Sequence, residues 1–128
     1  MYVLEGSRIL IVEDDPDGQM VVSHVVTQML SMPVDVVGNA FEALKLLAEQ
    51  SKAYKIAIID LSMPDMDGWQ LLNNIRQNPQ TETLPCVAVT AYHSSRTREE
   101  ALKSGFIAYF SKPIDTETVT SELKKYMG

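Results

Sequence analysis

Four short apolar runs of the sequence each end in polar side chains that could take part in chemistry. These side chains are Glu13 with Asp14, Asp60, Thr90 and Lys112. Clustered carboxylates repel one another and attract a cation, and hard oxygen ligands with open positions suit Mg²⁺, which pairs naturally with phosphate. A lysine adds a positive charge and a threonine adds a hydroxyl donor. If the fold brings these groups together, they are suited to phosphoryl transfer rather than to a hydrolytic triad.

Asp60 is the natural nucleophile of this set. A carboxylate at the end of a strand can be a helix cap, a metal ligand or a nucleophile, and Asp67 later in the same turn is the better candidate for the cap. Asp60 is therefore predicted to be ligand and nucleophile together. It would form an aspartyl phosphate by in-line transfer, with a metal ion and Lys112 stabilising the transferred charge.

The elements that must position these residues follow an alternating pattern. Five apolar runs are predicted strands and alternate with five stretches of helical pattern: Ile9–Val12, Val34–Val37, Ile56–Ile59, Cys86–Val89 and Ile107–Phe110. Such alternation predicts an α/β fold, a flavodoxin-like doubly wound parallel sheet with helices on both faces. In the strand order 2-1-3-4-5 the reversal falls between the first and third strands, so Asp14 and Asp60 would flank the ligand crevice.

The first helix is predicted to follow the first strand directly. Asp15 is its expected N-cap and Pro16 its first residue. Its inward face is expected to be an apolar stripe at helical spacing, formed by Val21, Val22, Val25, Val26, Met29 and Leu30.

Later helices are marked by caps and by apolar faces. Asp67–Gly68 is predicted to open one helix, and Thr97–Glu100 fits a capping box for the next, which Gly105 closes. Asn78–Leu84 is expected to be the most exposed loop. The last helix is expected to begin at Asp115 and to turn three side chains inward, namely Val119, Leu123 and Met127.

Composition limits the classes of protein that need to be considered. The 128 residues form one predicted domain, with 45% hydrophobic and 22% charged residues, as in ordinary globular proteins. The formal net charge of -6 argues against nucleic-acid binding. No apolar stretch is long enough to span a bilayer, and the first residues lack a signal-peptide pattern. The single Cys86 is expected to be a buried small hydrophobe. A cytoplasmic location is predicted, with no membrane contact.

Four motifs give the chain a close resemblance to a known family. They are ILIVEDD (9–15), DLSMPDMDG (60–68), VAVTA (87–91) and FSKP (110–113). Together, in this order and at the predicted strand ends, they resemble the receiver domain of bacterial two-component response regulators of the chemotaxis-regulator kind. The resemblance extends from Arg8 to the final helix.

The resemblance implies a role for each matching residue. Asp60 would accept a phosphoryl group from a sensor histidine kinase or a histidine phosphotransfer protein. Mg²⁺, or Mn²⁺ in its place, would be bound by the side chains of Asp14 and Asp60 and by the backbone carbonyl of Ser62. Glu13 would act through a metal-bound water. Lys112 and Thr90 would contact the phosphoryl oxygens.

The resemblance also implies how the signal leaves the domain. Tyr109 occupies the switch-aromatic position, three residues before the lysine, and would turn inward as Thr90 moves. The surface of the fourth helix, fifth strand and fifth helix would then change its preference for a downstream protein partner. Such a domain catalyses only its own phosphorylation and dephosphorylation, and is not a turnover enzyme.

Several alternatives stay open from the sequence. Thr90 could be only a strand-favouring residue, and Tyr109 only an ordinary aromatic. A haloacid-dehalogenase-type phosphatase also uses an aspartate, Mg²⁺ and a lysine, but it requires a second acid at the position of Ser62. The chain could also be a receiver excised from a hybrid kinase or a longer regulator, or an interaction module that is never phosphorylated.

Overall fold

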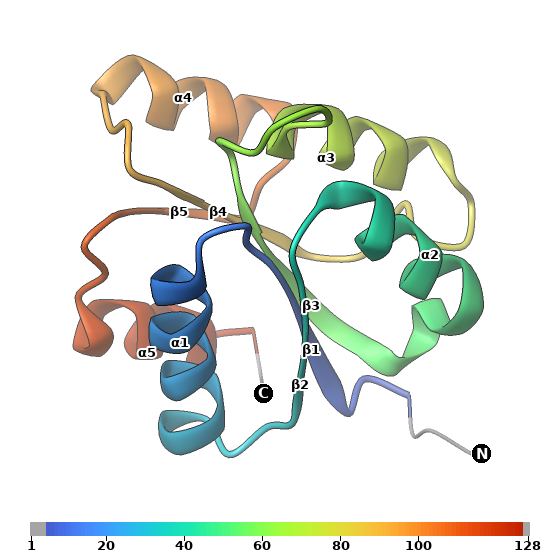
Figure 1. Ribbon diagram of the computed structural model, residues 1–128, viewed down its shortest axis with the longest axis horizontal. Helices are drawn as coiled ribbons and strands as arrows, with labels where there is room; N and C mark the ends of the chain where they lie inside the picture. Colours follow the sequence, from blue (N-terminus) through green and yellow to red (C-terminus); the bar gives the residue numbers. More distant parts are fainter. Residues whose placement is uncertain (1–4, 127–128) are drawn as a thin grey trace.

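A five-stranded parallel sheet forms the centre of the protein. The computed structural model describes residues 5–126 and has the strand order β2-β1-β3-β4-β5 (Figure 1). The strands are β1 (Arg8–Val12), β2 (Val34–Val37), β3 (Tyr54–Asp60), β4 (Cys86–Thr90) and β5 (Ala108–Ser111). Val12 lies opposite Ile59 in the register of β1 and β3, so the residues that follow them leave the sheet side by side. The predicted fold class and strand order are confirmed.

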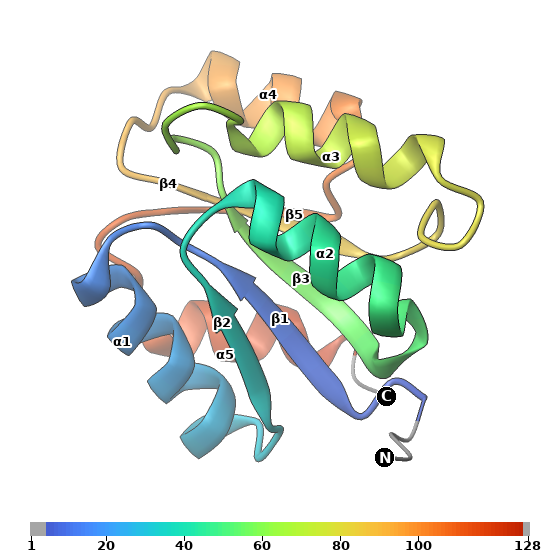
Figure 2. The same cartoon turned by 45° about the vertical axis from the view of Figure 1, so that its right-hand side comes forward.

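Five α-helices cover the two faces of this sheet. They are α1 (Pro16–His24), α2 (Ala40–Gln50), α3 (Gly68–Gln77), α4 (Ser95–Ser104) and α5 (Thr116–Lys124), with a short π-helical segment η1 (Val25–Met29) after α1 and a 3-10 turn η2 (Ser51–Ala53) after α2. Helices α1 and α5 pack on one face, and α2, α3 and α4 on the other (Figures 1 and 2).

Alternate residues of each strand enter different hydrophobic cores. In β1, Ile9 and Ile11 face α1 and α5, whereas Leu10 and Val12 face α2 and α3. Because both faces are covered, these strands are almost continuously apolar, as is usual for parallel sheets. The buried polar residues of the strands, Asp60 and Thr90, lie at strand ends, at the edge where the candidate site is found.

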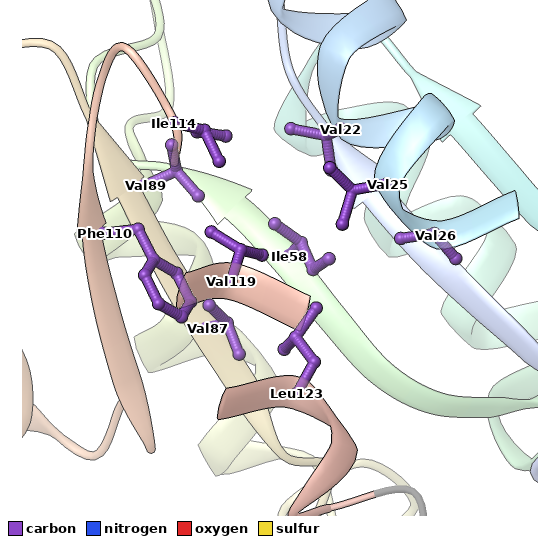
Figure 3. A pocket seen from close by; sticks show the side chains of 10 residues that line it. All are labelled: Val22, Val25, Val26, Ile58, Val87, Val89, Phe110, Ile114, Val119 and Leu123. Atoms are coloured by element: carbon purple, nitrogen blue, oxygen red, sulfur yellow. The ribbon is translucent and has the colours of Figure 1, made fainter. Parts of the chain in front are cut away.

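The core between α1, α5 and the sheet contains a small apolar cavity. It has a volume of about 10 Å³ and is lined by valine, isoleucine, leucine and phenylalanine side chains, among them Val22, Val25, Ile58, Phe110 and Val119 (Figure 3). A water molecule needs two or more polar partners to be held in such a space, and this lining provides none. The cavity is a packing defect of the core and has no room for a ligand.

The first helix begins as predicted but buries fewer residues than expected. Asp15 is the N-cap and its carboxylate accepts the Gly18 N–H at 3.1 Å. Val22 is buried, but Val21 and Met29 are 43% and 45% exposed, so the predicted stripe was too broad. The wider turns of η1 between Val25 and Met29 change the phase of the helix, which explains the exposure of Met29 but not that of Val21, because Val21 precedes η1.

Two further local predictions were wrong. Helix α4 is capped by Ser94, whose hydroxyl accepts the Thr97 N–H at 3.0 Å, so Thr97 lies within the helix and is not its cap. The loop over residues 78–84 is not uniformly exposed. Thr81 and Leu84 are buried, and the Thr81 hydroxyl donates to the Ile75 carbonyl at 2.7 Å.

Three other local predictions are confirmed. Gly105 closes α4 at a φ of 118°, Asp115 caps α5, and Cys86 is fully buried. The expected inward position of Met127 lies outside the described residues. Within residues 5–126, none of the helices has the length and apolar character needed to cross a membrane.

Candidate functional site

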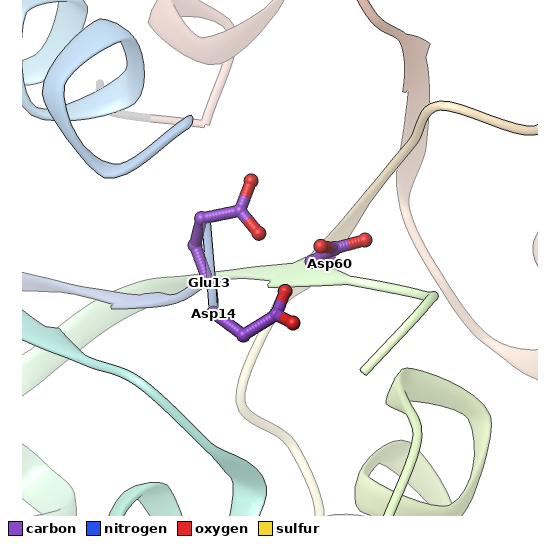
Figure 4. A group of neighbouring side chains, drawn as sticks. All are labelled: Glu13, Asp14 and Asp60. Atoms are coloured by element: carbon purple, nitrogen blue, oxygen red, sulfur yellow. The ribbon is translucent and has the colours of Figure 1, made fainter. Parts of the chain in front are cut away.

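Three carboxylates meet at the carboxyl edge of the sheet. Glu13 and Asp14 directly follow β1, and Asp60 ends β3 (Figure 4). One oxygen from each lies within 4.8 Å of the others. Glu13 and Asp60 are only 3% and 5% exposed, whereas Asp14 is open to solvent. The predicted convergence of these acids is confirmed, and two of the three acids lie where little water can reach them.

Lys112 is the cation that faces the buried acids. Its Nζ forms an ion pair with Glu13 Oε1 and lies 3.5 Å from Asp60 Oδ2. Burial, together with the neighbouring Asp60, raises the pKa of Glu13 to about 7 although Lys112 opposes this. Burial lowers the pKa of Lys112, but the hydrogen bond to Glu13 and the two negative charges outweigh it and raise that pKa. A single ammonium thus serves two buried carboxylates.

The position of Asp60 depends on the turn that follows it. Asp60 Oδ1 accepts the Ser62 N–H at 2.9 Å. Helix α3 begins against the backbone of β3, and a Cβ on Gly68 would lie only 2.6 Å from the Asp60 carbonyl oxygen. Glycine is therefore required there to bring the helix this close. Asp67, as predicted, caps α3 through a reciprocal capping box with Gln70.

Thr90 reaches the same edge but its hydroxyl is engaged elsewhere. It ends β4, is 1% exposed, and its Oγ1 accepts the Tyr92 N–H at 3.0 Å. The Thr90 carbonyl accepts the Lys112 N–H at 2.8 Å, which ties the ends of β4 and β5 together. The structure therefore places Thr90 beside the acids, with its hydroxyl bonded to its own loop.

Tyr109 is half-buried on β5 and contacts His93, which lies in the loop after Thr90. Its hydroxyl lies 3.1 Å from Nδ1 of His93, and the two ring centroids are 5.6 Å apart. Burial raises the pKa of the Tyr109 hydroxyl. The only sequence signal for this contact was the place of His93, three residues after Thr90.

The acidic group has the donors that a divalent cation requires. Its ligand atoms are carboxylate oxygens, and the single neighbouring ammonium leaves negative charge uncompensated. Hard oxygen donors of this kind, with one member open to solvent, suit Mg²⁺, which keeps several of its waters. The residues present thus fit a divalent metal site.

Comparison with known proteins agrees with this fold and site. The response regulator receiver domain family matches residues 9–124. An uncharacterized 14.6 kDa protein in the sodA1 3′ region of Leptolyngbya boryana is 37% identical, over 98% of this chain and 94% of that protein. Probable histidine kinase 1 of Oryza sativa subsp. indica is 28% identical over 94% of this chain, which spans only 15% of that kinase.

A solved structure with the same fold supports the metal assignment. It is the receiver domain of the sensor histidine kinase PA1611 from Pseudomonas aeruginosa PAO1, which holds a magnesium ion in its active-site cleft. The two structures have a TM-score of 0.82 and 26% sequence identity, over 96% of this chain and 98% of the other.

Fold and site together define a signalling domain that is switched by phosphorylation. The chain belongs to the response regulator receiver domain family of two-component systems. It is therefore not a haloacid-dehalogenase-type phosphatase. The acidic group and the magnesium-bound relative support binding of a divalent metal ion.

Proposed function

We propose that Asp60 is the phosphoacceptor of this domain. The observation that supports this most strongly is its position at the end of the central strand β3. Asp60 is buried, its Oδ1 accepts the Ser62 N–H at 2.9 Å, and its Oδ2 lies 3.5 Å from Lys112 Nζ, whereas the Glu13 carboxylate is already closely paired with Lys112. A carboxylate oxygen of Asp60 attacks the phosphorus of a phosphohistidine, and the phosphorus–nitrogen bond breaks as the imidazole takes up a proton. The donor is a sensor histidine kinase or a histidine phosphotransfer protein.

The metal-binding residues of this proposal are Asp14 and Asp60 through their side chains and Ser62 through its backbone carbonyl. Glu13 contributes through a bound water. When bound, Mg²⁺ supplies positive charge that offsets the charge of the phosphoryl oxygens; Mn²⁺ can take its place because the donors are the same. Lys112 exchanges its carboxylate partners for the phosphoryl group, which leaves its positive charge at the reacting centre.

The switch begins with the hydroxyl of Thr90. The hydroxyl oxygen no longer accepts the Tyr92 N–H, and the hydroxyl donates a hydrogen bond to a phosphoryl oxygen. The loop between β4 and α4 then moves, and Tyr109 leaves His93 and turns inward. These changes alter the face formed by α4, β5 and α5. A full shift from 1:99 to 99:1 requires about 5.5 kcal/mol of difference between the two states.

The output of the domain is protein binding. The domain catalyses only its own phosphorylation and dephosphorylation, has no separate substrate, and acts in the cytoplasm on a downstream protein that docks on the α4–β5–α5 face. The net charge of -6 argues against a nucleic-acid partner.

Labelling with a small phosphodonor such as acetyl phosphate, in the presence of Mg²⁺, tests the phosphoacceptor directly. We expect one phosphoryl group per chain, measured by mass spectrometry of the intact protein, and none in Asp60→Asn. Asp65→Asn is the matched control, because Asp65 is an exposed turn residue of the same segment. Labelling of the Asp60→Asn variant would contradict the assignment.

Trp69 allows metal binding to be measured separately. It follows Gly68 at the start of α3 and its ring makes an edge-to-face contact with Phe106, with centroids 6.1 Å apart. We expect Mg²⁺ to change Trp69 fluorescence in the wild type and in Asp65→Asn, and much less in Asp14→Ala. Equal responses in the three proteins would remove Asp14 from the metal site.

A further inference from the structure

We infer that Gly18 is a positioning residue for the acidic group, because it leaves the space in which the carboxylate of Glu13 lies. This inference rests on the proposed function of the site. Gly18 belongs to the first turn of α1, and a Cβ built on it would lie 2.7 Å from Cδ and 3.0 Å from Cγ of Glu13, and closer still to Oε1. Any other residue at position 18 would require the carboxylate to move.

The Glu13 carboxylate is held from several sides in this space. Its Oε1 pairs with Lys112, and its Oε2 lies 3.5 Å from the Asp15 N–H. The backbone of Glu13 is also fixed, since its carbonyl accepts the Gln19 side-chain amide at 2.7 Å. The side chain is 3% exposed. The first turn of α1 thus encloses the acid that meets Lys112.

The atoms that a Cβ at position 18 would meet are the end of a side chain and not backbone. Glu13 can rotate away without disturbing the sheet, so Gly18→Ala keeps the fold. Alanine is also a better helix former than glycine, so this substitution favours α1. The displaced carboxylate would separate from Lys112 and from its place beside Asp60.

The length of the acid at position 13 and the presence of a Cβ at position 18 are therefore coupled. Aspartate is one methylene shorter than glutamate, so its carboxylate ends short of the space beside Gly18. A glutamate at this position needs the glycine, whereas an aspartate does not. This coupling distinguishes a positioning role of Gly18 from a general requirement of the helix.

Four proteins test the coupling: the wild type, Gly18→Ala, Glu13→Asp and the double variant. Gly38→Ala is the matched control, because nothing lies closer than 3.9 Å to a Cβ at Gly38. Each is titrated with Mg²⁺ by Trp69 fluorescence. We expect Gly18→Ala to raise the Mg²⁺ concentration at half-saturation about tenfold, as is usual when a residue that orients metal ligands is lost. The double variant should match Glu13→Asp, and Gly38→Ala the wild type.

Crystal structures of the metal-free proteins give a second measurement that does not depend on metal. The ion pair between Lys112 and Glu13 should be broken in Gly18→Ala, whereas the carboxylate of residue 13 should occupy the same position in Glu13→Asp and in the double variant. Any of three results would overturn the inference. Gly18→Ala could lower the Mg²⁺ affinity equally in the wild type and in Glu13→Asp, or it could leave the affinity of the wild type unchanged. The crystal structure of Gly18→Ala could also show Glu13 in its original position.

The same set separates this inference from the proposed function. If the wild type neither binds Mg²⁺ nor labels on Asp60, the proposed function fails. If the wild type does both and Gly18→Ala behaves like it, the function stands and only the positioning role of Gly18 is wrong.

Discussion

Two clusters of polar side chains lie at opposite ends of the same strands, and they differ in how well their charges are balanced. The anchor cluster, at the amino end, consists of Arg8, Asp35, Tyr54 and Gln50. Arg8 donates to both oxygens of Asp35, at 2.9 and 2.7 Å, and the Tyr54 hydroxyl donates to the same carboxylate at 2.8 Å. The hydrogen bond from Arg8 is the main cause that lowers the pKa of Asp35.

The acidic cluster, at the carboxyl end, consists of Glu13, Asp14 and Asp60. Among residues 5–126, Lys112 is the one cation paired with it, and burial, together with Asp60, raises the pKa of Glu13. The comparison shows two effects on a carboxyl group: matched partners lower the pKa of Asp35, whereas deep burial beside another acid raises the pKa of Glu13, so that its charge is costly in the folded protein. The excess of negative charge is what favours a bound cation. The following experiments change one cluster or the other, so that their effects can be set side by side.

The largest expected effect is a fall in the stability of the metal-free protein as the pH rises. The pKa of Glu13 is about 7 in the folded protein and ordinarily 4.5. A carboxyl with a raised folded-state pKa stabilises the fold below its ordinary pKa, and this contribution is lost as the pH rises through the folded value. The difference between these two pKa values corresponds to about 3 kcal/mol in the free energy of unfolding. Urea unfolding between pH 4.5 and 7.5 should show that the free energy of unfolding falls in the wild type and not in Glu13→Gln. The same dependence on pH in both proteins would contradict this prediction.

The next effect is the stabilisation by Mg²⁺, which should depend on the acidic cluster alone. At a concentration one hundred times its dissociation constant, the ion should raise the free energy of unfolding by about 2.7 kcal/mol. Thermal unfolding with and without Mg²⁺ measures this gain. It should be largely lost in Asp14→Asn and fully kept in Asp35→Ala, which is the matched change in the anchor cluster.

Asp35→Ala should lower the free energy of unfolding by about 2 kcal/mol at neutral pH, because Arg8 and Tyr54 lose a charged acceptor. The pH dependence has the opposite sign to that of Glu13. Asp35 has a lowered pKa, so its contribution is present above its ordinary pKa and disappears as the pH falls through the folded value. The difference between wild type and variant should therefore shrink in acid, and a difference that grows in acid would refute this account.

The smallest expected effect is that of Tyr54→Phe, about 1 kcal/mol. It removes the hydroxyl that donates to Asp35 and accepts from Gln50 at 2.9 Å, but it leaves the pair of Arg8 and Asp35 in place. Tyr126→Phe is the control, since the Tyr126 hydroxyl is an exposed donor to Ile107 at 3.3 Å. Both variants are compared with wild type by urea unfolding at pH 7.

The acidic cluster could be predicted from the sequence, whereas the anchor cluster could not. Glu13, Asp14 and Asp60 each directly follow or end an apolar strand, and parallel strands place their carboxyl ends at one edge. Arg8 and Asp35 are 27 residues apart and meet only through the register of β1 with β2, in which Leu10 lies opposite Asp35. That register depends on packing and not on local patterns.

The sequence led to the wrong N-cap for α4, because two nearby residues could both cap this helix. Ser94 and Thr97 are both good N-cap residues, and the structure uses Ser94, whose hydroxyl also lies 2.8 Å from that of Thr97. Gly18 is a clearer omission. A glycine in the first turn of a helix, five residues after a buried acid, was a signal of close approach that could have been used.

The two clusters are joined by one short strand, and this has a consequence for amide hydrogen exchange. Strand β1 pairs with β2 on one side and β3 on the other, and Arg8 begins it while Glu13 follows its end. We therefore expect the amides of β1 to exchange mainly when the whole domain opens, and to be among the slowest of the described residues. Residues 91–94 are exposed, so we expect them to exchange much faster and the loop beside the acidic cluster to open while β1 stays closed.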